Sequence, residues 1–517
     1  MSALFAFKPV PAPLTGFKRK LKLIYQNTPF YKLHLSKSPP SYLNLTPMDP
    51  WPGQVMIGQQ LCEGFLNVKE DLYMVSNFWQ DCEDNTAIGK DLYAFHFLRD
   101  LRSVGDSTSR RLARDLILSW IDEHPNWKHA SWEIEPLTQR IYNWLALFDF
   151  YGSSAENSCH KIIFKSLLKQ ARHLVHSISL CSNGFLRFQA LKSLLFLVIC
   201  FEKDITSKKS NFDILLKHLE KESVSLCLND GCVQSRNPYK QVLFLKDLID
   251  IRTILRQAQL RIPEFLQQRI ELVTPIVRFF RHGDGGISNL AQRHSLTPSF
   301  IDTILSLSDV KHPTPLRLVK GGYERLAARH SIVIVNTGPR STNLPVNYLA
   351  TGCLNFEWSV GALRLIQEAS LCAETQDGYL YKATIGKFLA KTSRKHHQGH
   401  QLCTSSYELK EGFRHERDIY LNPNGLSLSG CDRVVALEES MIVLRFLLDD
   451  SVLLKHQGKT IALYDGKRLQ PQWLFSFKQA ESLVIEEDDG RPVILGCFKL
   501  EEAKPVLLEW SFKFLGE

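Results

Sequence analysis

Hydrophobic and polar residues follow two different periods along this 517-residue chain. From about residue 90 to about residue 315, apolar residues recur at spacings of three and four, as in "SRRLARDLILSWIDEH" and "LTQRIYNWLALF". This spacing predicts amphipathic helices that pack as antiparallel hairpins. Apolar residues cover more than one stripe on several of these segments, so each such helix is expected to have two neighbours.

After about residue 316 the pattern changes to short segments with alternating apolar and polar residues. Examples are "HSIVIVNTG" and "DRVVALEES", and the turns between such segments hold Asn-Pro-Asn-Gly, Asp-Gly and Asp-Asp-Gly. These features predict an antiparallel β-sandwich. The chain shows neither βαβ alternation nor a glycine-rich phosphate loop.

We therefore expect an α-then-β, multidomain architecture. Its parts are a basic N-terminal arm and capping segment (1–90), an all-α domain (91–315) and an antiparallel β-sandwich (316–517). A cleft between the two large domains is the natural ligand site.

The net charge bears on which partners the chain could bind, and the cysteines bear on the compartment in which it works. The formal net charge is +9, and residues 1–50 carry seven basic residues against Asp49 alone. We interpret "GFKRKLKLIY" as a solvated basic arm, with contact to an anionic membrane surface as the alternative. No motif for nucleic-acid recognition accompanies this charge, so no nucleic-acid partner is predicted.

The twelve cysteines form no CxxC pair and mostly lie in apolar runs, which is typical of free thiols in a reducing compartment. The N-terminus lacks the pattern of a secretory signal, which favours the cytoplasm. The longest apolar run, residues 194–200, is too short to span a bilayer, so no transmembrane segment is predicted.

One loop combines more chemistry than a turn needs. The stretch "NDGCVQSRNPYK" at 229–240 lies between two helical patterns and brings Ser235, Arg236, Asn237 and Tyr239 together. Asp-Gly and Asn-Pro suffice for the turn itself. The guanidinium, the amide and the phenol therefore suggest a binding or catalytic role.

Several stretches, in this order, resemble the heparinase II/III-like family of polysaccharide lyases, in particular its bacterial branch without a long export leader. They include "YAFHFLRDLRSVG", "DGCVQSRNP", "PIVRFFRHGDGG", "LNFEWSVG" and "FRHERDIYLNPNGLSLSGCDRV". The resemblance extends from "TPMDPWPGQ" near residue 46 to the C-terminus. It implies an incomplete α/α toroid followed by an antiparallel β-sandwich, and an anionic, uronate-containing glycan as substrate.

A lyase of this kind cleaves by β-elimination. It neutralises the uronate carboxylate, removes the C5 proton with a base and protonates the leaving O4 with an acid. Arg236 and Asn237 suit the first task, and Tyr239 and His415 suit proton transfer. The alternatives are that Arg236 pairs with an acid, Asn237 sets the turn, Tyr239 packs at a helix start and His415 bonds a neighbouring strand.

Further residues are candidates for substrate contact. Arg281 and His282 in "RHGDGG" would line the cleft, or else that segment is a turn that ends a helix. Trp132 would stack on sugar rings and Arg140 would contact anionic sugar, or else both are structural. Two residues of the β-domain are also candidates for substrate contact: Tyr407 in "TSSY" and Arg417, which lies beside His415 in "FRHER".

The chain also departs from the family pattern. Val233 and Ala350 stand where the family has histidines, and "TSSY" replaces a His-Asp-Gly-Tyr element. The resemblance makes a metal conceivable, but with Ala350 at the usual histidine position none is predicted. These losses leave a second hypothesis open, a catalytically impaired glycan-binding or scaffold protein on the same fold. The family also implies the periplasm or cell envelope as the alternative compartment.

Overall fold

The computed structural model describes most of the chain, with short gaps. The described residues are 16–26, 28–35, 42–68, 71–74, 78–79, 92–125, 127–202, 211–290, 296–338, 354–374, 391–397, 400–408, 414–435, 440–466, 470–479, 481–501 and 504–516. They form two compact units: unit 1 comprises residues 1–226 and 246–270, and unit 2 comprises residues 227–245 and 271–517. Unit 2 thus takes in helical residues that precede the first strand of the sandwich.

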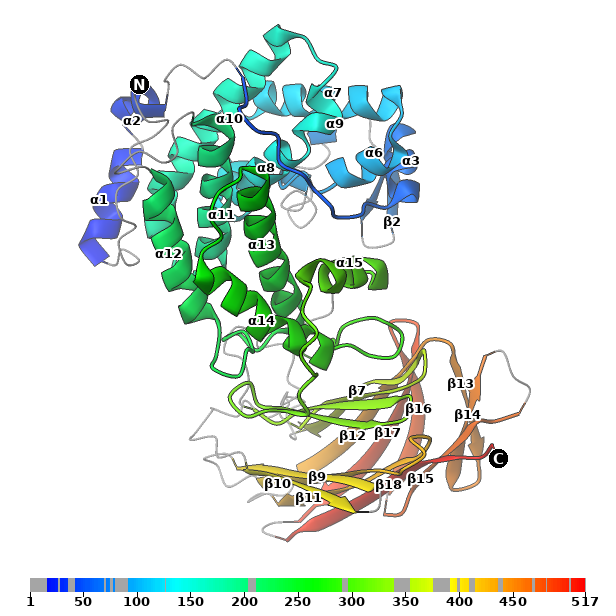
Figure 1. Ribbon diagram of the computed structural model, residues 1–517. Coiled ribbons are helices and arrows are strands. Elements are labelled where there is room, and N and C mark those ends of the chain that lie inside the picture. The colour runs from blue at the N-terminus through cyan, green and yellow to red at the C-terminus, as the bar shows by residue number, and fades with distance from the viewer. Residues whose placement is uncertain are drawn as a thin grey trace. The chain divides into compact units, whose positions relative to one another are not determined.

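Unit 1 is helical apart from one small hairpin (Figure 1). Helices α13 (Pro238–Gln257) and α14 (Glu264–Phe279) contribute residues to both units. The other elements of unit 1 are α1 (Gly16–Gln26), α2 (Pro29–Leu35), α3 (Val55–Cys62), β1 (Phe65–Val68), β2 (Asp71–Met74), α6 (Leu98–Val104), α7 (Ser107–Glu123), η1 (Ala130–Trp132), α8 (Ile134–Ala146), α9 (Phe148–Gly152), α10 (Asn157–Ser177), η2 (Ile178–Leu180), α11 (Gly184–Phe201) and α12 (Asn211–Leu226).

Helix α11 is the central helix of unit 1. It packs against α8, α10 and α12, and its residues from Arg187 to Phe201 are all buried. Among the described helices, α11 is the one that is long and apolar enough to cross a membrane, but 83% of the apolar window is buried within the structure. Its hydrophobicity is therefore that of a core helix with neighbours on several sides.

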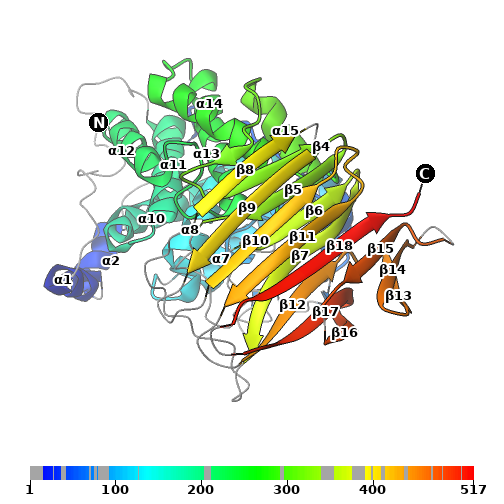
Figure 2. The ribbon, with the colours of Figure 1, turned by 90° about the horizontal axis from the view of Figure 1, so that it is seen from below.

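Unit 2 contains α15 (Pro298–Ser308) and two antiparallel sheets of eight strands each. One sheet has the order β13-β14-β15-β18-β11-β10-β9-β8, and Figure 2 shows its strands β8 to β11 and β18 side by side. Its strands are β8 (Lys391–His397), β9 (His400–Glu408), β10 (Arg414–Leu421), β11 (Leu428–Val435), β13 (Val452–Gln457), β14 (Thr460–Asp465), β15 (Trp473–Phe477) and β18 (Val506–Phe514).

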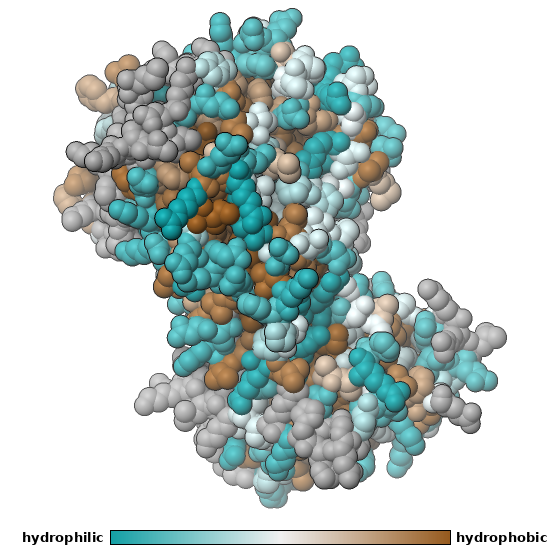
Figure 3. All heavy atoms as spheres, in the orientation of Figure 1, coloured by the Kyte–Doolittle hydropathy of each residue, from teal (hydrophilic) through white to brown (hydrophobic). Residues whose placement is uncertain are grey.

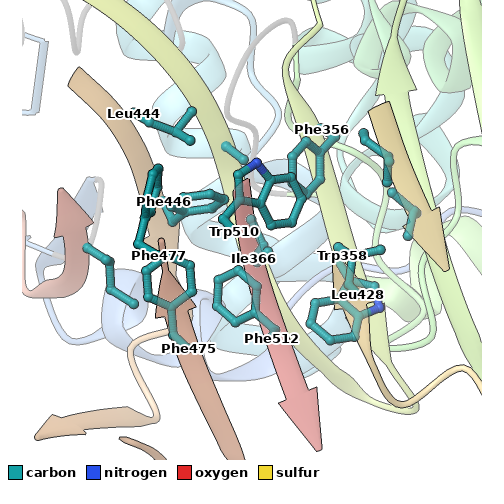
Figure 4. Close-up of a cluster of buried hydrophobic side chains, with 14 of the residues drawn as sticks. Phe356, Trp358, Ile366, Leu428, Leu444, Phe446, Phe475, Phe477, Trp510 and Phe512 are labelled. Carbon is teal, nitrogen blue, oxygen red and sulfur yellow. The ribbon is translucent and has the colours of Figure 1, made fainter. Parts of the chain in front are cut away.

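The second sheet has the order β16-β17-β12-β7-β6-β5-β4-β3. Its strands are β3 (Arg317–Leu318), β4 (Tyr323–Ala328), β5 (Ser331–Asn336), β6 (Phe356–Val360), β7 (Leu363–Glu374), β12 (Ser440–Leu448), β16 (Ser482–Asp488) and β17 (Arg491–Leu500). The inner faces of the two sheets supply one apolar core (Figure 4). At its centre the Trp510 ring lies against Phe356 and Phe446, with ring centroids 5.5 and 5.3 Å away. Helices followed by an antiparallel sandwich confirm the predicted fold class.

Candidate functional site

The segment 227–237, here called the Arg236 loop, is tied to the turn between β3 and β4. The Asp230 carboxylate accepts hydrogen bonds from the backbone N–H groups of Lys320 and Gly321, at 2.7 and 2.8 Å. Gly231 has φ +87°, and a Cβ there would lie 2.5 Å from a backbone carbonyl of α14. The Asp-Gly pair of the sequence therefore fixes where the loop docks.

Arg236 joins this loop to the turn between β3 and β4 and to strand β5. Its Nε donates to the Gly321 carbonyl at 2.6 Å, and its Nη2 donates to the Gly322 carbonyl at 3.2 Å and to the Asn336 side chain. Its guanidinium lies 5.1 Å from the centre of the Tyr323 ring, whose hydroxyl donates to the Arg236 carbonyl. A largely buried guanidinium with three such bonds acts as a clamp between loop and sheet.

Asn237 is the N-cap of α13. Its side-chain oxygen accepts from the backbone N–H groups of Tyr239 and Lys240, at 2.9 and 3.3 Å. This is the ordinary way to satisfy a helix start. Tyr239 and Lys240 are both half-buried, and the nearby Lys320 is exposed.

His415 lies inside the sandwich, in what we call the Asp432 cluster (His415, Arg417, Asp432 and Trp510). The Asp432 carboxylate lies 2.6 Å from His415 Nε2 and 2.5 Å from Arg417 Nε, and it accepts from Trp510 Nε1 at 2.7 Å. Arg417 also donates to the Leu354 carbonyl at 2.7 Å. The side chains of His415 and Asp432 are 0% exposed and that of Arg417 is 1% exposed, so none of them reaches solvent.

The ionisable groups of the Asp432 cluster shift one another's pKa values. Burial alone would raise the pKa of Asp432, but Arg417 and His415 lower it to about 2. Burial lowers the pKa of His415, although Asp432 opposes this. The arrangement is a buried ion pair with an extra hydrogen-bond donor, which is typical of a structural site.

His282 is enclosed in the same way. Its Nε2 lies 2.8 Å from the Glu357 carboxylate and its Nδ1 lies 2.9 Å from Ser359 Oγ, and the His282 and Glu357 side chains are 0% exposed. Glu357 also accepts from the backbone N–H of Asn289 at 2.7 Å. These bonds fasten the segment after α14 to β6, which agrees with a turn that ends a helix.

The remaining candidates of unit 2 are placed as follows. Arg281 pairs with Asp302 at 2.5 Å in an exposed position. The backbone of Tyr407 on β9 lies opposite His415 on β10, and the Tyr407 side chain is outside the described residues. Ala350 is also outside them.

Arg140 and Trp132 belong to unit 1 and are buried. Arg140 donates to Gln170 at 2.8 Å and to two backbone carbonyls, and its guanidinium lies 3.9 Å from the centre of the Trp120 ring. Burial lowers the pKa of Arg140. Trp132 is 2% exposed and its Nε1 donates to the carbonyl of His124 at 2.9 Å. Both residues therefore fill the interior of the helical unit.

A polar network in unit 1 was not predicted. Lys192 on α11 bonds to Asp247 and lies 2.9 Å from Asp250, both on α13, and Lys246 lies 2.8 Å from Asp250. Gln189 donates to Asp247 at 3.0 Å. Burial lowers the pKa of Lys246 to about 8, although Asp250 opposes this. The charges within the apolar run "ALKSLLFLVICF" and within "LFLKDLIDI" were the sequence signal for this network.

The outer face of the first sheet carries a shallow hollow of about 420 Å³, also missed by the sequence reasoning. It lies on β10, β11, β15 and β18. Its lining residues are Asp418, Tyr420, Ser429, Gly430, Cys431, Ser476, Lys478, Glu509, Trp510 and Ser511. The charged side chains in the lining are Asp418, Glu509 and Lys478, so the hollow has no net positive charge.

Metal-ligating side chains do not gather in threes anywhere in the part of the chain that the structure describes. The histidines that would contribute to such a group, His282 and His415, each face a carboxylate and further hydrogen-bonding groups instead.

Comparison with solved structures identifies the fold. The fold is that of the structure "Crystal Structure of Heparinase III", with a TM-score of 0.64 at 12% identity over 96% of this chain and 88% of that chain. A heparan sulfate lyase from Pedobacter heparinus gives a TM-score of 0.54 at 12% identity, covering 96% of this chain and 89% of that one. These likenesses confirm the α toroid followed by the β-sandwich.

Part of the β-domain matches a known family. Residues 373–493 match the family described as "Heparinase II/III-like, C-terminal", which supports the resemblance to the heparinase II/III-like family. The chain is also 24% identical, over 312 residues, to FtsZ-localized protein C of Caulobacter vibrioides. That match covers 60% of this chain and spans about half, 53%, of the length of the relative.

Proposed function

We propose that the chain is a polysaccharide lyase that cleaves a uronate-containing, anionic glycan by β-elimination, with Tyr239 as its proton-transfer residue. The observation that carries the proposal is the position of Tyr239, half-buried at the first turn of α13 on a loop that Asp230 and Arg236 hold in place. The other residue expected to transfer protons, His415, is enclosed in the sandwich. Of these two residues, Tyr239 is the one that is partly exposed.

The chemistry needs one group that takes a proton and returns it. The phenolate of Tyr239 removes the proton at C5, the freed electron pair forms the C4–C5 double bond, and the C4–O4 bond breaks. The phenol then protonates O4. One residue can perform both transfers only when the C5 hydrogen and O4 lie on the same face of the ring, so uronates of that configuration are the proposed substrates.

Two lysines, one on α13 and one on the turn between β3 and β4, are proposed to recognise the uronate carboxylate. Lys240 follows Tyr239 on α13, and Lys320 lies on the turn to which Asp230 is bonded. A cation beside the carboxylate makes the C5 proton more acidic. In this proposal Arg236 and Asn237 position the loop, and His415 and Arg417 hold the sandwich together.

A second candidate function is glycan binding without cleavage. The enclosure of both His282 and His415 in carboxylate pairs favours it, because neither histidine is then available as a partner for Tyr239. The same surface around Tyr239 and Lys240 would hold the glycan.

The two candidates are separated by one experiment. The purified protein is incubated with heparan sulfate, heparin, alginate and a bacterial exopolysaccharide while the ultraviolet absorbance of the unsaturated uronate is followed. We expect a rise that falls at least about 100-fold in Tyr239→Phe and persists in Tyr464→Phe, a matched change of a half-buried tyrosine on β14. Binding without any rise supports the second candidate, and a rise that Tyr239→Phe leaves unchanged refutes the role of this residue.

The cysteines support a reducing compartment. The nine cysteines in the described part of the chain are all free, which is usual for proteins of the cytoplasm. We therefore propose that the protein works in the cytoplasm of a bacterial cell.

A further inference from the structure

The two N-terminal helices carry an unusual share of the exposed apolar surface. Of the 21 large apolar side chains that are exposed in the described residues, seven lie between residues 17 and 33. On α1, Phe17, Leu21 and Ile24 are 73%, 49% and 62% exposed. Their spacing of four and three residues places them in one stripe along the helix. Such a stripe in water needs an explanation.

Helix α2 also carries exposed apolar residues. Phe30 and Leu33 are 74% and 71% exposed, and they lie three residues apart on one face of the helix. Figure 3 shows apolar side chains at the outer edge of the helical unit, where Figure 1 places α1 and α2. We call the five residues Phe17, Leu21, Ile24, Phe30 and Leu33 the apolar stripe.

The opposite faces of both helices are fastened to unit 1. The Tyr31 hydroxyl lies 2.7 Å from His173 Nδ1, and Arg172 donates to the Leu35 carbonyl at 2.8 Å. Lys22 donates to Ser179 at 2.5 Å, and Trp127 Nε1 donates to the Gln26 carbonyl at 3.0 Å. The apolar stripe is thus presented on docked helices.

The charge of the N-terminal segment indicates which kind of partner contacts the apolar stripe. The first 48 residues contain seven lysines and arginines and no aspartate or glutamate, which accounts for most of the net charge of +9. Helix α1 alone has Lys18, Arg19, Lys20 and Lys22. A second copy of the chain would bring the same positive charge and be repelled, whereas an anionic lipid surface matches both the charge and the apolar stripe.

We propose that α1 and α2 dock the protein on the surface of an anionic lipid bilayer, with the apolar stripe inserted at the level of the headgroups. The exposed basic residues of α1, Arg19 and Lys20, then meet the lipid phosphates. Attachment is to the surface, because the one described helix long enough to span a bilayer, α11, is buried in the core of unit 1.

Vesicle co-sedimentation with the full chain tests the proposal. The probes are vesicles of phosphatidylcholine alone and of phosphatidylcholine with one quarter phosphatidylglycerol. We expect binding only to the anionic vesicles, weakened by salt because the attraction between basic residues and lipid is screened. The double variant Arg19→Glu, Lys20→Glu should lower the partition coefficient at least about 25-fold, since each basic residue near the surface contributes about fivefold.

The apolar stripe is tested with Phe17→Ser, Leu21→Ser and Ile24→Ser combined. The matched control combines Ile162→Ser, Leu453→Ser and Leu515→Ser, which are exposed apolar residues elsewhere. We expect the first triple variant to lose vesicle binding and the control to keep it, with both showing the circular dichroism of the parent. Equal binding by both triple variants, or no binding of the parent chain to anionic vesicles at low salt, would overturn the proposal. So would a lipid-free dimer that only the stripe variant abolishes, because the stripe would then be a protein interface.

Discussion

Replacing Asp432 by Asn removes one charge from the Asp432 cluster and changes little else in shape. Arg417, at 1% exposure, then keeps its charge without a carboxylate, and His415 loses its partner. The fall in the pKa of Asp432 from 3.8 to about 2 is equivalent to about 2 kcal/mol of folding free energy. Adding the cost of the orphaned arginine, we expect Asp432→Asn to destabilise the protein by about 3–5 kcal/mol.

The assay is urea unfolding followed by tryptophan fluorescence, since Trp510 lies in the cluster. The matched control is Glu416→Gln on β10, a partly exposed carboxylate 3.0 Å from Arg433, which should cost less than about 1 kcal/mol. A lowered carboxyl pKa contributes stability above the unfolded value, and this contribution is lost as the pH falls toward 2. The part of the difference that comes from the Asp432 carboxylate should therefore be fully present at pH 7 and shrink as the pH falls below about 4. A difference below about 1 kcal/mol at pH 7 would refute the buried cluster.

Two further outcomes concern the stability of the fold. Arg236→Lys should destabilise the protein by about 2 kcal/mol in urea unfolding, because an ammonium cannot reproduce the bonds to Gly321, Gly322 and Asn336; an unchanged midpoint would contradict the clamp. Lys192→Met should cost about 3–5 kcal/mol, because two buried carboxylates lose their shared cation; retention of parental stability would contradict the network. The lyase and vesicle experiments described above add the outcomes for Tyr239 and for the apolar stripe.

The architecture could be predicted because period and turn chemistry agree along the chain. Apolar spacings of three and four mark helices such as α7 and α8, and alternation of apolar and polar residues marks strands such as β18. The boundaries of the two units were harder to predict from the sequence. Helices α13 and α14 belong to both units, and nothing in their apolar pattern shows which residues pack with the strands.

The burial of His415 could have been derived from its strand. Along β10, Ile419 and Leu421 face the core. The residues two and four positions before Ile419 must share that face, because side chains alternate along a strand. His415 and Arg417 occupy those inward positions, so their types suggested chemistry while their register indicated burial. The resemblance to a lyase family drew attention to the residue type and away from the register.

Other features depend on tertiary contacts that no local pattern contains. The bonds of Arg236 reach residues about 85 to 100 positions away in the chain. The Lys192 network likewise joins α11 to α13, and its charges could be noticed in apolar runs but their partners could not be named.

The most direct test of the proposed function is the mass of the ends created in a uronate-containing oligosaccharide after incubation with the protein. β-Elimination leaves an unsaturated uronate at the new non-reducing end, lighter by one water than the product of hydrolysis. We predict this unsaturated end with the parent chain and its loss with Tyr239→Phe. Intact oligosaccharide, or products with hydrated ends only, would contradict a lyase.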